Sequence, residues 1–292
     1  MIVRLREPAF EVLEPGELGC PVVFSSPHSG RFYPDSFLDA SRLNAFELRR
    51  SEDAFVDLLL TPAAESGVPL IHARFPRAYL DVNREPYELD PRLIDGPLPG
   101  FANTRSMRVA AGLGAVPRIV ADGQEIYRRR LTIAEALERV ETLHKPFHAC
   151  LRRLLQRARC AFGAALLVDW HSMPSSDTTG GRAIPDFVLG DRFATSCTPR
   201  IVDAVEASLR AKGYSVARNK PYAGGFITES YGNPPKGMLA LQIEVSRALY
   251  MDERSLTPNS GFKTLARDFV EIADLLRQML PGSEQAARIA AE

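Results

Sequence analysis

Histidines and carboxylates follow or interrupt the apolar runs of this chain. His28 and His171 each come directly after such a run, and Glu244 lies within a third run, at 239–245. Imidazole nitrogens and a carboxylate oxygen are the ligands of hydrolytic zinc sites, in which a fourth position stays open for water. If these runs are strands of one sheet with a common direction, the sequence predicts such a site at one edge of that sheet.

Each of these residues also has a structural alternative. A single histidine after a strand is usually a structural residue, so His28 by itself indicates packing more often than a ligand. His171 is better supported, because Asp169 lies two residues earlier on the same strand face and can fix its tautomer. A carboxylate among apolar residues is costly unless it is paired or functional. Glu244 is therefore either a general base or a buried ion-pair partner.

A short polar segment places Arg77, Asn83 and Arg84 within eight residues. Guanidinium groups bind carboxylates through two parallel hydrogen bonds. The segment therefore predicts a binding site for a substrate that carries a carboxylate, with surface salt bridges as the structural alternative.

A glycine-bearing stretch at 219–228 (NKPYAGGFIT) supplies further candidate substrate contacts. It lacks the spacing of a nucleotide-binding loop, so a nucleotide site is disfavoured. Its glycines also suit close approach of the backbone to a small polar substrate. Tyr222, Gly225 and Thr228 are the candidate contacts of this stretch.

Two histidines stand four residues apart on a predicted helix. This spacing of His144 and His148 is found in two-histidine metal sites. No glutamate adjoins them, so helix packing is the favoured interpretation. His148, which is next to Phe147, is retained as a candidate substrate contact.

The sequence offers little for covalent catalysis. It contains no Gly-x-Ser-x-Gly motif, and its four cysteines form no Cys-x-x-Cys pair. These features disfavour an acyl-enzyme mechanism, a disulfide framework and a thiolate zinc site. A catalytic metal would therefore depend on the histidines and carboxylates.

The elements that must position these residues alternate between strands and helices. Strands are predicted at 21–26, 68–73, 78–82, 164–170, 185–189 and 239–245, and helices at 42–60, 123–159, 198–212 and 262–281. The first helix is expected to stop at Pro62, and the second to break near Pro146. This alternation is typical of an α/β fold with helices on both faces of the sheet.

Composition limits the classes of function. The 292 residues hold 36 Lys and Arg against 36 Asp and Glu, and 45% of them are hydrophobic. Zero net charge predicts neither nucleic acid nor an acidic membrane surface as a partner. No apolar tract reaches the about 18 residues of a membrane span, and the N-terminus lacks a signal-peptide pattern, so a cytoplasmic enzyme is expected. Without a linker or repeat, residues 1–292 are predicted to form one domain.

Six segments together resemble one known family, the N-formylglutamate amidohydrolases. They are SSPHSGRFYP (25–34), SEDAFVDLL (51–59), ARFPRAYLDVNREP (73–86), LLVDWHSMP (166–174), NKPYAGGFITESYGNP (219–234) and LQIEVSRALYMDE (241–253). They occur in the family's order and extend over nearly the whole chain. The family hydrolyses the small molecule N-formyl-L-glutamate to formate and L-glutamate in histidine degradation. The resemblance implies a fold similar to that of zinc carboxypeptidases and aspartoacylase (phosphorylase/hydrolase-like), an α/β domain with three layers, αβα, and a mixed central sheet.

The resemblance also implies a metal site. In the wider group a His-x-x-Glu motif and a later histidine bind zinc, but here Arg31 stands where the glutamate would be. The family pattern points instead to Asp53, with Glu52 as the alternative, beside His28 and His171. Zn²⁺ is the implied cofactor, and Co²⁺ or Mn²⁺ could replace it.

The remaining roles follow from the same resemblance. Arg77 would polarise the scissile carbonyl, and Asn83 with Arg84 would hold a substrate carboxylate. Glu244 would act as the general base, as in the aspartoacylase group.

Substrate choice is open at this point. A pocket closed by Met173 or Tyr222 would favour a formyl group, but one methylene changes binding by only about 1–3 kcal/mol. The alternatives are a hydrolase of another N-acyl amino acid or small acidic peptide, and a non-catalytic protein that binds an acidic metabolite. Retention of both histidines together with Glu244 favours catalysis, since binding alone needs no general base.

Overall fold

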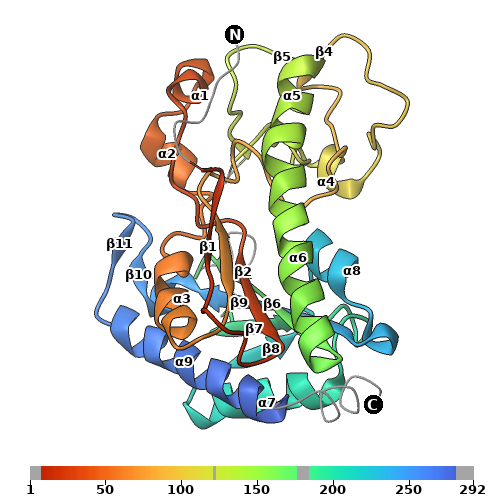
Figure 1. The fold of residues 1–292 in the computed structure, drawn as a ribbon. Coiled ribbons are helices and arrows are strands. Elements are labelled where there is room, and N and C mark those ends of the chain that lie inside the picture. The colour runs from red at the N-terminus through yellow and green to blue at the C-terminus, as the bar shows by residue number, and fades with distance from the viewer. Residues whose placement is uncertain (1–7, 121–122, 176–183, 281–292) are drawn as a thin grey trace. The chain divides into compact units, whose positions relative to one another are not determined.

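The computed structural model describes residues 8–120, 123–175 and 184–280 (Figure 1). Contacts within the chain separate these residues into two units. The first unit contains residues 8–11, 27–54, 72–120 and 123–150, and the second contains residues 12–26, 55–71, 151–175 and 184–280. The prediction of one domain over residues 1–292 stays a prediction.

A mixed sheet of seven strands, in the order β1-β3-β2-β6-β9-β7-β8, carries several of the candidate residues. Its strands are β1 (Phe10–Leu13), β3 (Leu70–Ala73), β2 (Val22–Ser26), β6 (Ala165–Met173), β9 (Met238–Ser246), β7 (Phe187–Gly190) and β8 (Val216–Arg218). β6 is parallel to β2 and to β9, whereas β7 is antiparallel to β9 and parallel to β8. The mixed sheet that the family resemblance implies is therefore confirmed.

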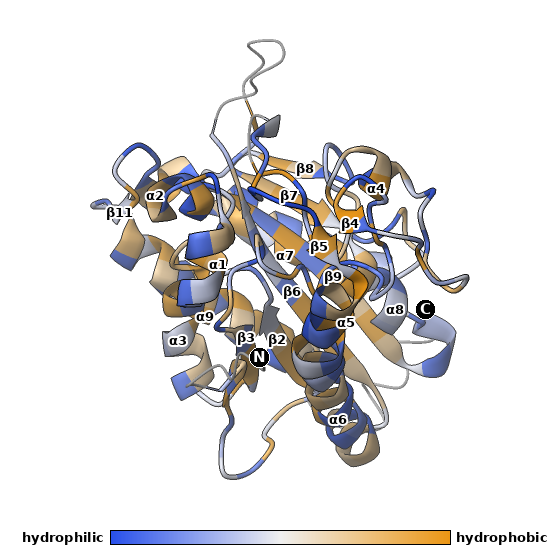
Figure 2. Ribbon diagram, turned by 90° about the horizontal axis from the view of Figure 1, so that it is seen from above, coloured by the Kyte–Doolittle hydropathy of each residue, from blue (hydrophilic) through white to orange (hydrophobic). Residues whose placement is uncertain are grey.

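The two central strands of this sheet are buried along their whole length. Every residue of β6 and all but the first residue of β9 are buried. Continuous apolar runs of this kind suit strands that are covered on both faces. Figure 2 shows hydrophobic colour along much of these strands.

Helices of the second unit cover both faces of its strands. They include α3 (Val56–Glu65), α7 (Pro199–Ala211), α8 (Phe226–Tyr231) and α9 (Phe262–Met279). The ring of Trp170 lies 4.3 Å from that of Phe269 in α9. Asp169 points to the opposite face, where its register partner Gln242 accepts a hydrogen bond from the amide of Gly225, at the start of α8. The predicted αβα layers are thus confirmed.

Most elements with strong periodicity lie where the sequence predicts them. The strands predicted at 21–26, 68–73, 164–170, 185–189 and 239–245 are β2, β3, β6, β7 and β9, and the helices predicted at 198–212 and 262–281 are α7 and α9. Short elements were missed: β1, β8, α8, α1 (Asp35–Ala40), α4 (Met107–Ala110), and the pairs β4 (Ile94–Asp95) with β5 (Leu131–Thr132) and β10 (Met251–Asp252) with β11 (Thr257–Pro258). Elements this short carry too few residues for a periodic signal.

The helix predicted at 42–60 is wrong in its extent. The structure has α2 (Ala45–Arg49), which begins with a capping box at Asn44, and then α3, separated by residues 50–55. The amide of Asp53 donates to the carbonyl oxygen of His28, so it is not available for a helical hydrogen bond. Pro62 does not end α3 either: the helix continues to Glu65, since proline removes only one backbone bond near the end of the helix.

The strand predicted at 78–82 is also wrong. The amides of Tyr79 and Leu80 both donate to the carbonyl oxygen of Pro76, and residues 77–79 form a turn. Ala78, Leu80 and Val82 are buried, but so are Asp81 and Asn83. The apolar residues of this segment therefore reflect the packing of a folded turn rather than a strand with one buried face.

The long helix predicted at 123–159 begins later and does not break. Thr132 forms a capping box at the start of α5 (Ile133–Arg139), which continues through a π-helical turn, η2 (Val140–His144), into α6 (Lys145–Phe162). Pro146 follows the π turn, whose wider hydrogen-bond spacing absorbs the missing amide of a proline. Two 3₁₀ turns, η3 (Pro234–Lys236) and η4 (Arg247–Leu249), complete the described elements. No helix in the described ranges is long and apolar enough to cross a membrane.

Candidate metal and substrate site

His28 follows β2 in a segment whose path requires a glycine. A Cβ atom on Gly30 would lie 2.1 Å from the carbonyl oxygen of Phe75, so a side chain cannot be accommodated there. The amide of Phe32 donates to the carbonyl oxygen of Arg74 over 2.9 Å. Within the first unit, this contact fixes the segment that carries His28.

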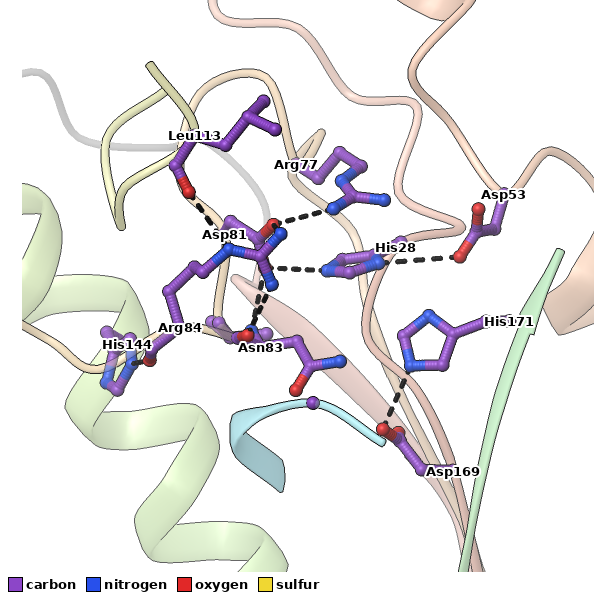
Figure 3. A network of polar contacts seen from close by, with 12 residues as sticks. His28, Asp53, Arg77, Asp81, Asn83, Arg84, Leu113, His144, Asp169 and His171 are labelled. Atoms are coloured by element: carbon purple, nitrogen blue, oxygen red, sulfur yellow. Dashed lines mark hydrogen bonds and ion pairs between the residues drawn. The ribbon is translucent and has the colours of Figure 1, made fainter. Parts of the chain in front are cut away.

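His28 lies between two buried carboxylates of the first unit (Figure 3). Its Nε2 atom is 2.7 Å from Asp81 Oδ1, and its Nδ1 atom is 3.4 Å from Asp53 Oδ2. The three side chains are at most 2% exposed. The backbone hydrogen bond between Asp53 and His28 measures 3.0 Å. The residues between α2 and α3 thus hold the Asp53 carboxylate against the imidazole.

The spacing of His28 and Asp53 fits a shared metal ion. Two atoms about 2.0–2.1 Å from a tetrahedral zinc ion lie about 3.4 Å apart, which is the separation of His28 Nδ1 and Asp53 Oδ2. A charge-assisted hydrogen bond between them would be shorter, about 2.7–2.9 Å. Asp81 binds the other ring nitrogen, as a carboxylate does in carboxylate–histidine–zinc arrangements.

Glu52, the alternative ligand, has other partners. Its carboxylate accepts a hydrogen bond from the Tyr33 hydroxyl over 2.7 Å and from Arg49 Nε over 3.2 Å. Burial raises the pKa of Glu52, although the bonds from Tyr33 and Arg49 act in the opposite direction. The geometry favours Asp53 over Glu52 as the metal donor.

Asp81 is the central acceptor of this cluster, and it was not among the candidate site residues of the sequence. It accepts hydrogen bonds from Arg77 Nη2 and from the amide of Asn83, each over 2.8 Å, in addition to its contact with His28 (Figure 3). Burial acts to raise the pKa of Asp81, but the charges of Arg84, His28 and Arg77 outweigh it and hold that pKa well below its usual range. Asp81 links His28, a predicted metal ligand, to the arginines.

Arg84 is oriented by carbonyl groups. Its Nε donates to the carbonyl oxygen of Leu113 over 2.9 Å and its Nη1 to that of Asn83 over 2.7 Å, while Nη2 lies 3.6 Å from Asp81. Burial lowers the pKa of Arg84 to about 10, against the opposing charge of Asp81, so the side chain stays positive at neutral pH. Arg77 and Arg84 share the carboxylate of Asp81, so two positive charges face one negative charge. The surroundings of Asp81 in the first unit therefore suit an anionic group.

His144 and His148 contact the backbone beside Arg84. Their Nε2 atoms donate to the carbonyl oxygens of Arg84 and Val82, over 2.9 and 2.8 Å. The prediction that packing dominates at this pair agrees with these contacts. The prediction of His148 as a substrate contact stays a prediction.

In the second unit, β6 and β9 carry two polar pairs side by side. Asp169 and His171 of β6 are register partners of Gln242 and Glu244 of β9. His171 Nε2 is 2.9 Å from Asp169 Oδ2, and Gln242 Nε2 donates to Glu244 Oε1 over 2.9 Å. Because residues two apart on a strand point to one face, all four side chains share a face of the sheet.

The loop at 219–225 is attached to the same face of β9. The amide of Gly225 donates to Gln242 Oε1 over 2.7 Å, and Thr228 Oγ1 donates to the carbonyl oxygen of Gly225 over 2.9 Å. The loop needs glycine at Gly224, where φ is +119°. Tyr222 remains 39% exposed, whereas Met173 is buried at the end of β6.

The predicted metal ligands all belong to buried positions. His28 and Asp53 of the first unit and His171 of the second each offer one donor atom of the kind that binds metal ions. Each histidine also has one ring nitrogen hydrogen-bonded to a carboxylate, His28 to Asp81 and His171 to Asp169.

The chain is similar in sequence to proteins of known activity. Residues 20–251 match the family model described as N-formylglutamate amidohydrolase. An N-formylglutamate deformylase of Pseudomonas putida is 32% identical over 238 residues, which cover 80% of this chain and 82% of that protein. An N-formylglutamate deformylase of Pseudomonas aeruginosa is 32% identical over 241 residues, which cover 80% and 84%.

Solved structures are similar as well. An N-formylglutamate amidohydrolase from Ralstonia eutropha JMP134 superposes with a TM-score of 0.86 at 37% identity, covering 97% of this chain and 99% of that one. The gene product Atu2144 from Agrobacterium tumefaciens has the same fold, with a TM-score of 0.68 at 20% identity over 94% and 96% of the two chains. Together with the family model, these similarities confirm the resemblance that the six segments predict: the chain belongs to the N-formylglutamate amidohydrolase family.

Proposed function

We propose that this chain is a metal-dependent amidohydrolase that converts N-formyl-L-glutamate to formate and L-glutamate. The observation that carries the proposal is the 3.4 Å approach of His28 Nδ1 to Asp53 Oδ2, beside the arginines that share Asp81. Membership of the family and the names of the Pseudomonas and Ralstonia relatives support this substrate.

The proposed metal ligands are His28, Asp53 and His171. His28 and Asp53 belong to the first unit and His171 to the second. Two imidazoles and a carboxylate suit Zn²⁺, and Co²⁺ or Mn²⁺ accept the same donors. A divalent ion bound there would polarise the formyl carbonyl and make a bound water more acidic.

Glu244 is the proposed general base. Its carboxylate is oriented by the hydrogen bond from Gln242, and the register of β6 and β9 places it beside His171. In this role Glu244 takes a proton from the water that attacks the formyl carbon. It then gives the proton to the amine nitrogen as the carbon–nitrogen bond breaks, so that formate and L-glutamate leave.

The first unit supplies the charges that bind the substrate. Arg77 would stabilise the negative charge that develops on the formyl oxygen, a contact worth about 3–4 kcal/mol in other hydrolases. Asn83 and Arg84 would hold a carboxylate of the substrate and thereby orient its amide bond.

The glycine-bearing loop supplies the remaining proposed contacts. Tyr222, Gly225 and Thr228 are the substrate contacts proposed in the second unit, and Met173 or Tyr222 would limit the acyl pocket to a formyl group.

The test is formate release from N-formyl-L-glutamate by the purified protein, before chelation, after chelation and after addition of Zn²⁺. We expect release that chelation abolishes and Zn²⁺ restores. Release that ignores the chelator would contradict the metal-dependent mechanism. Zinc-loaded protein that releases no formate, but hydrolyses N-acetyl-L-glutamate or another N-acyl amino acid, would contradict the proposed substrate.

A further inference from the structure

A pair of stacked histidines supports the segment that carries the proposed carboxylate-binding residues. The rings of His144 and His148 have their centroids 4.4 Å apart, with an angle of 29° between their planes. Their hydrogen bonds go to the carbonyl oxygens of Arg84 and Val82. These two carbonyl groups flank Asn83, so the pair holds the backbone on both sides of that residue.

The pair is built into the interior of the first unit. His144 and His148 are 3% and 6% exposed. The ring of Phe147, on the same helix, packs against the ring of Phe10, with centroids 6.0 Å apart. His144 ends the π turn η2, and π turns in helices are uncommon and frequently occur at functional sites. Burial lowers the pKa of His144, although its bond to the Arg84 carbonyl acts in the opposite direction. A neutral ring suits both the stacking and the hydrogen bond that Nε2–H donates to the Arg84 carbonyl oxygen.

The same segment is held from its other side by Asp81. The amide of Asn83 donates to Asp81, and the carbonyl oxygen of Asn83 accepts from Arg84 Nη1. The histidine pair therefore completes a set of contacts that fixes three consecutive peptide groups, from Val82 to Arg84. Since a misplacement of about 1 Å in a substrate-binding group can lower kcat/KM about 100-fold, fixing this backbone has a functional consequence.

We propose that His144 and His148 are positioning residues for Asn83 and Arg84, and that they set how tightly the substrate carboxylate is held. The proposal rests on the proposed function, in which Asn83 and Arg84 bind that carboxylate. Neither imidazole takes part in bond breaking.

The test compares three variants, each with one histidine replaced. His148→Leu removes the donor to Val82, and His148→Gln keeps an amide donor at the place of Nε2. His72→Gln is the matched control, because His72 lies in β3 of the same unit and is 12% exposed. KM and kcat are measured with N-formyl-L-glutamate and with its two monoamides, N-formyl-L-glutamine and N-formyl-L-isoglutamine, and affinity for L-glutamate is measured by calorimetry.

We expect His148→Leu to raise KM for the diacid about tenfold with little change in kcat, because a displaced Asn83 and Arg84 hold the carboxylate less tightly in the ground state and in the transition state alike. The preference for the diacid is the ratio of its kcat/KM to that of whichever monoamide the wild type binds more weakly. This ratio should fall by a similar factor. His148→Gln should restore most of both losses, and His72→Gln should resemble the wild type.

An unchanged KM in His148→Leu, or an equal loss on the diacid and both monoamides, would overturn the positioning role. Calorimetry separates this failure from a failure of the proposed function. A wild type that releases no formate but binds L-glutamate, with His148→Leu weakened, would keep the positioning role while the deformylase activity fails. If His148→Leu does not fold, His148→Asn supplies the same comparison, because its amide is too short to reach the position of Nε2.

Discussion

His171 and Glu244 are register partners on the neighbouring parallel strands β6 and β9. Adjacent strands lie about 4.8 Å apart, so the imidazole and the carboxylate leave the sheet side by side on one face. Asp169 and Gln242 form the equivalent pair two residues earlier and contact the same two side chains. A shift of one residue would turn every side chain of a strand to the other face, so the buried sheet itself fixes this arrangement.

The variant Glu244→Gln tests the proposed base. Glutamine keeps the size and the hydrogen bond from Gln242 but cannot take a proton, so we expect kcat to fall by about 10²–10⁴-fold. Metal content should stay at the wild-type value, since Glu244 is not a proposed ligand. Initial rates of formate release and metal analysis of the same samples check both expectations.

Glu206→Gln is the matched control for that experiment. Glu206 lies on α7 and pairs with Arg210 and Arg218, away from β6 and β9 in sequence and in its contacts. Its variant should keep wild-type rates. Near-normal activity of Glu244→Gln would remove Glu244 from the mechanism.

The choice between Asp53 and Glu52 is tested by metal content. Asp53→Ala removes a proposed ligand. Loss of a residue that only hydrogen-bonds to a metal ligand lowers metal affinity about 10–100-fold, so we expect loss of the ligand itself to lower zinc affinity more than 100-fold. Glu52→Gln should keep the metal, because the Glu52 carboxylate contacts Tyr33 and Arg49. The measurement is a zinc titration against a competing chelator. The reverse result, with zinc lost only in Glu52→Gln, would reassign the ligand.

How well the sequence predicts the site depends on how far apart along the chain the contacting residues lie. Apolar runs predict β6 and β9, and the polar residues within them lead directly to His171 and Glu244. Asp53 could be identified only through the family resemblance, because its approach to His28 depends on a backbone bond between segments 25 residues apart. No periodic pattern records such a contact.

Asp81 was missed for a related reason. Its bond to His28 joins residues 53 positions apart. The surrounding segment forms a turn where the sequence predicts a strand, and all of residues 80–83 are buried. Tertiary packing overrides local pattern there.

Asp81→Asn should affect metal and substrate together. Loss of the carboxylate weakens the support of His28, so we expect metal affinity to fall about 10–100-fold. Arg77 and Arg84 lose their shared partner in the same variant, so KM for N-formyl-L-glutamate should change even at saturating Zn²⁺. Zinc titration and steady-state kinetics at saturating Zn²⁺ measure the two effects separately.

Asp90→Asn is the control for Asp81→Asn. Asp90 is also a buried carboxylate of the first unit that pairs with two arginines, Arg92 and Arg118. Its variant should lower stability without changing zinc affinity or KM. Equal changes in both variants would show that general destabilisation, and not the link through Asp81, causes them.

The start of α5 gives a prediction about stability alone. Thr132 Oγ1 accepts from the amide of Glu135, and the Glu135 carboxylate accepts from the amide of Thr132 in return. Thr132→Ala removes the cap, and we expect the free energy of unfolding to fall by about 1 kcal/mol, with unchanged KM. Denaturant unfolding at neutral pH measures this loss.

The same cap predicts a dependence on pH. Hydrogen bonds from Arg129 and Thr132 lower the pKa of Glu135 from 4.5 to about 2, so its stabilising effect is complete above pH 4.5 and is lost as the pH falls towards 2. The wild type should therefore be more stable than Glu135→Gln at neutral pH, and the difference should shrink on acidification over that range. A difference that stays constant down to pH 2 would mean that the charge of Glu135 does not contribute to the cap.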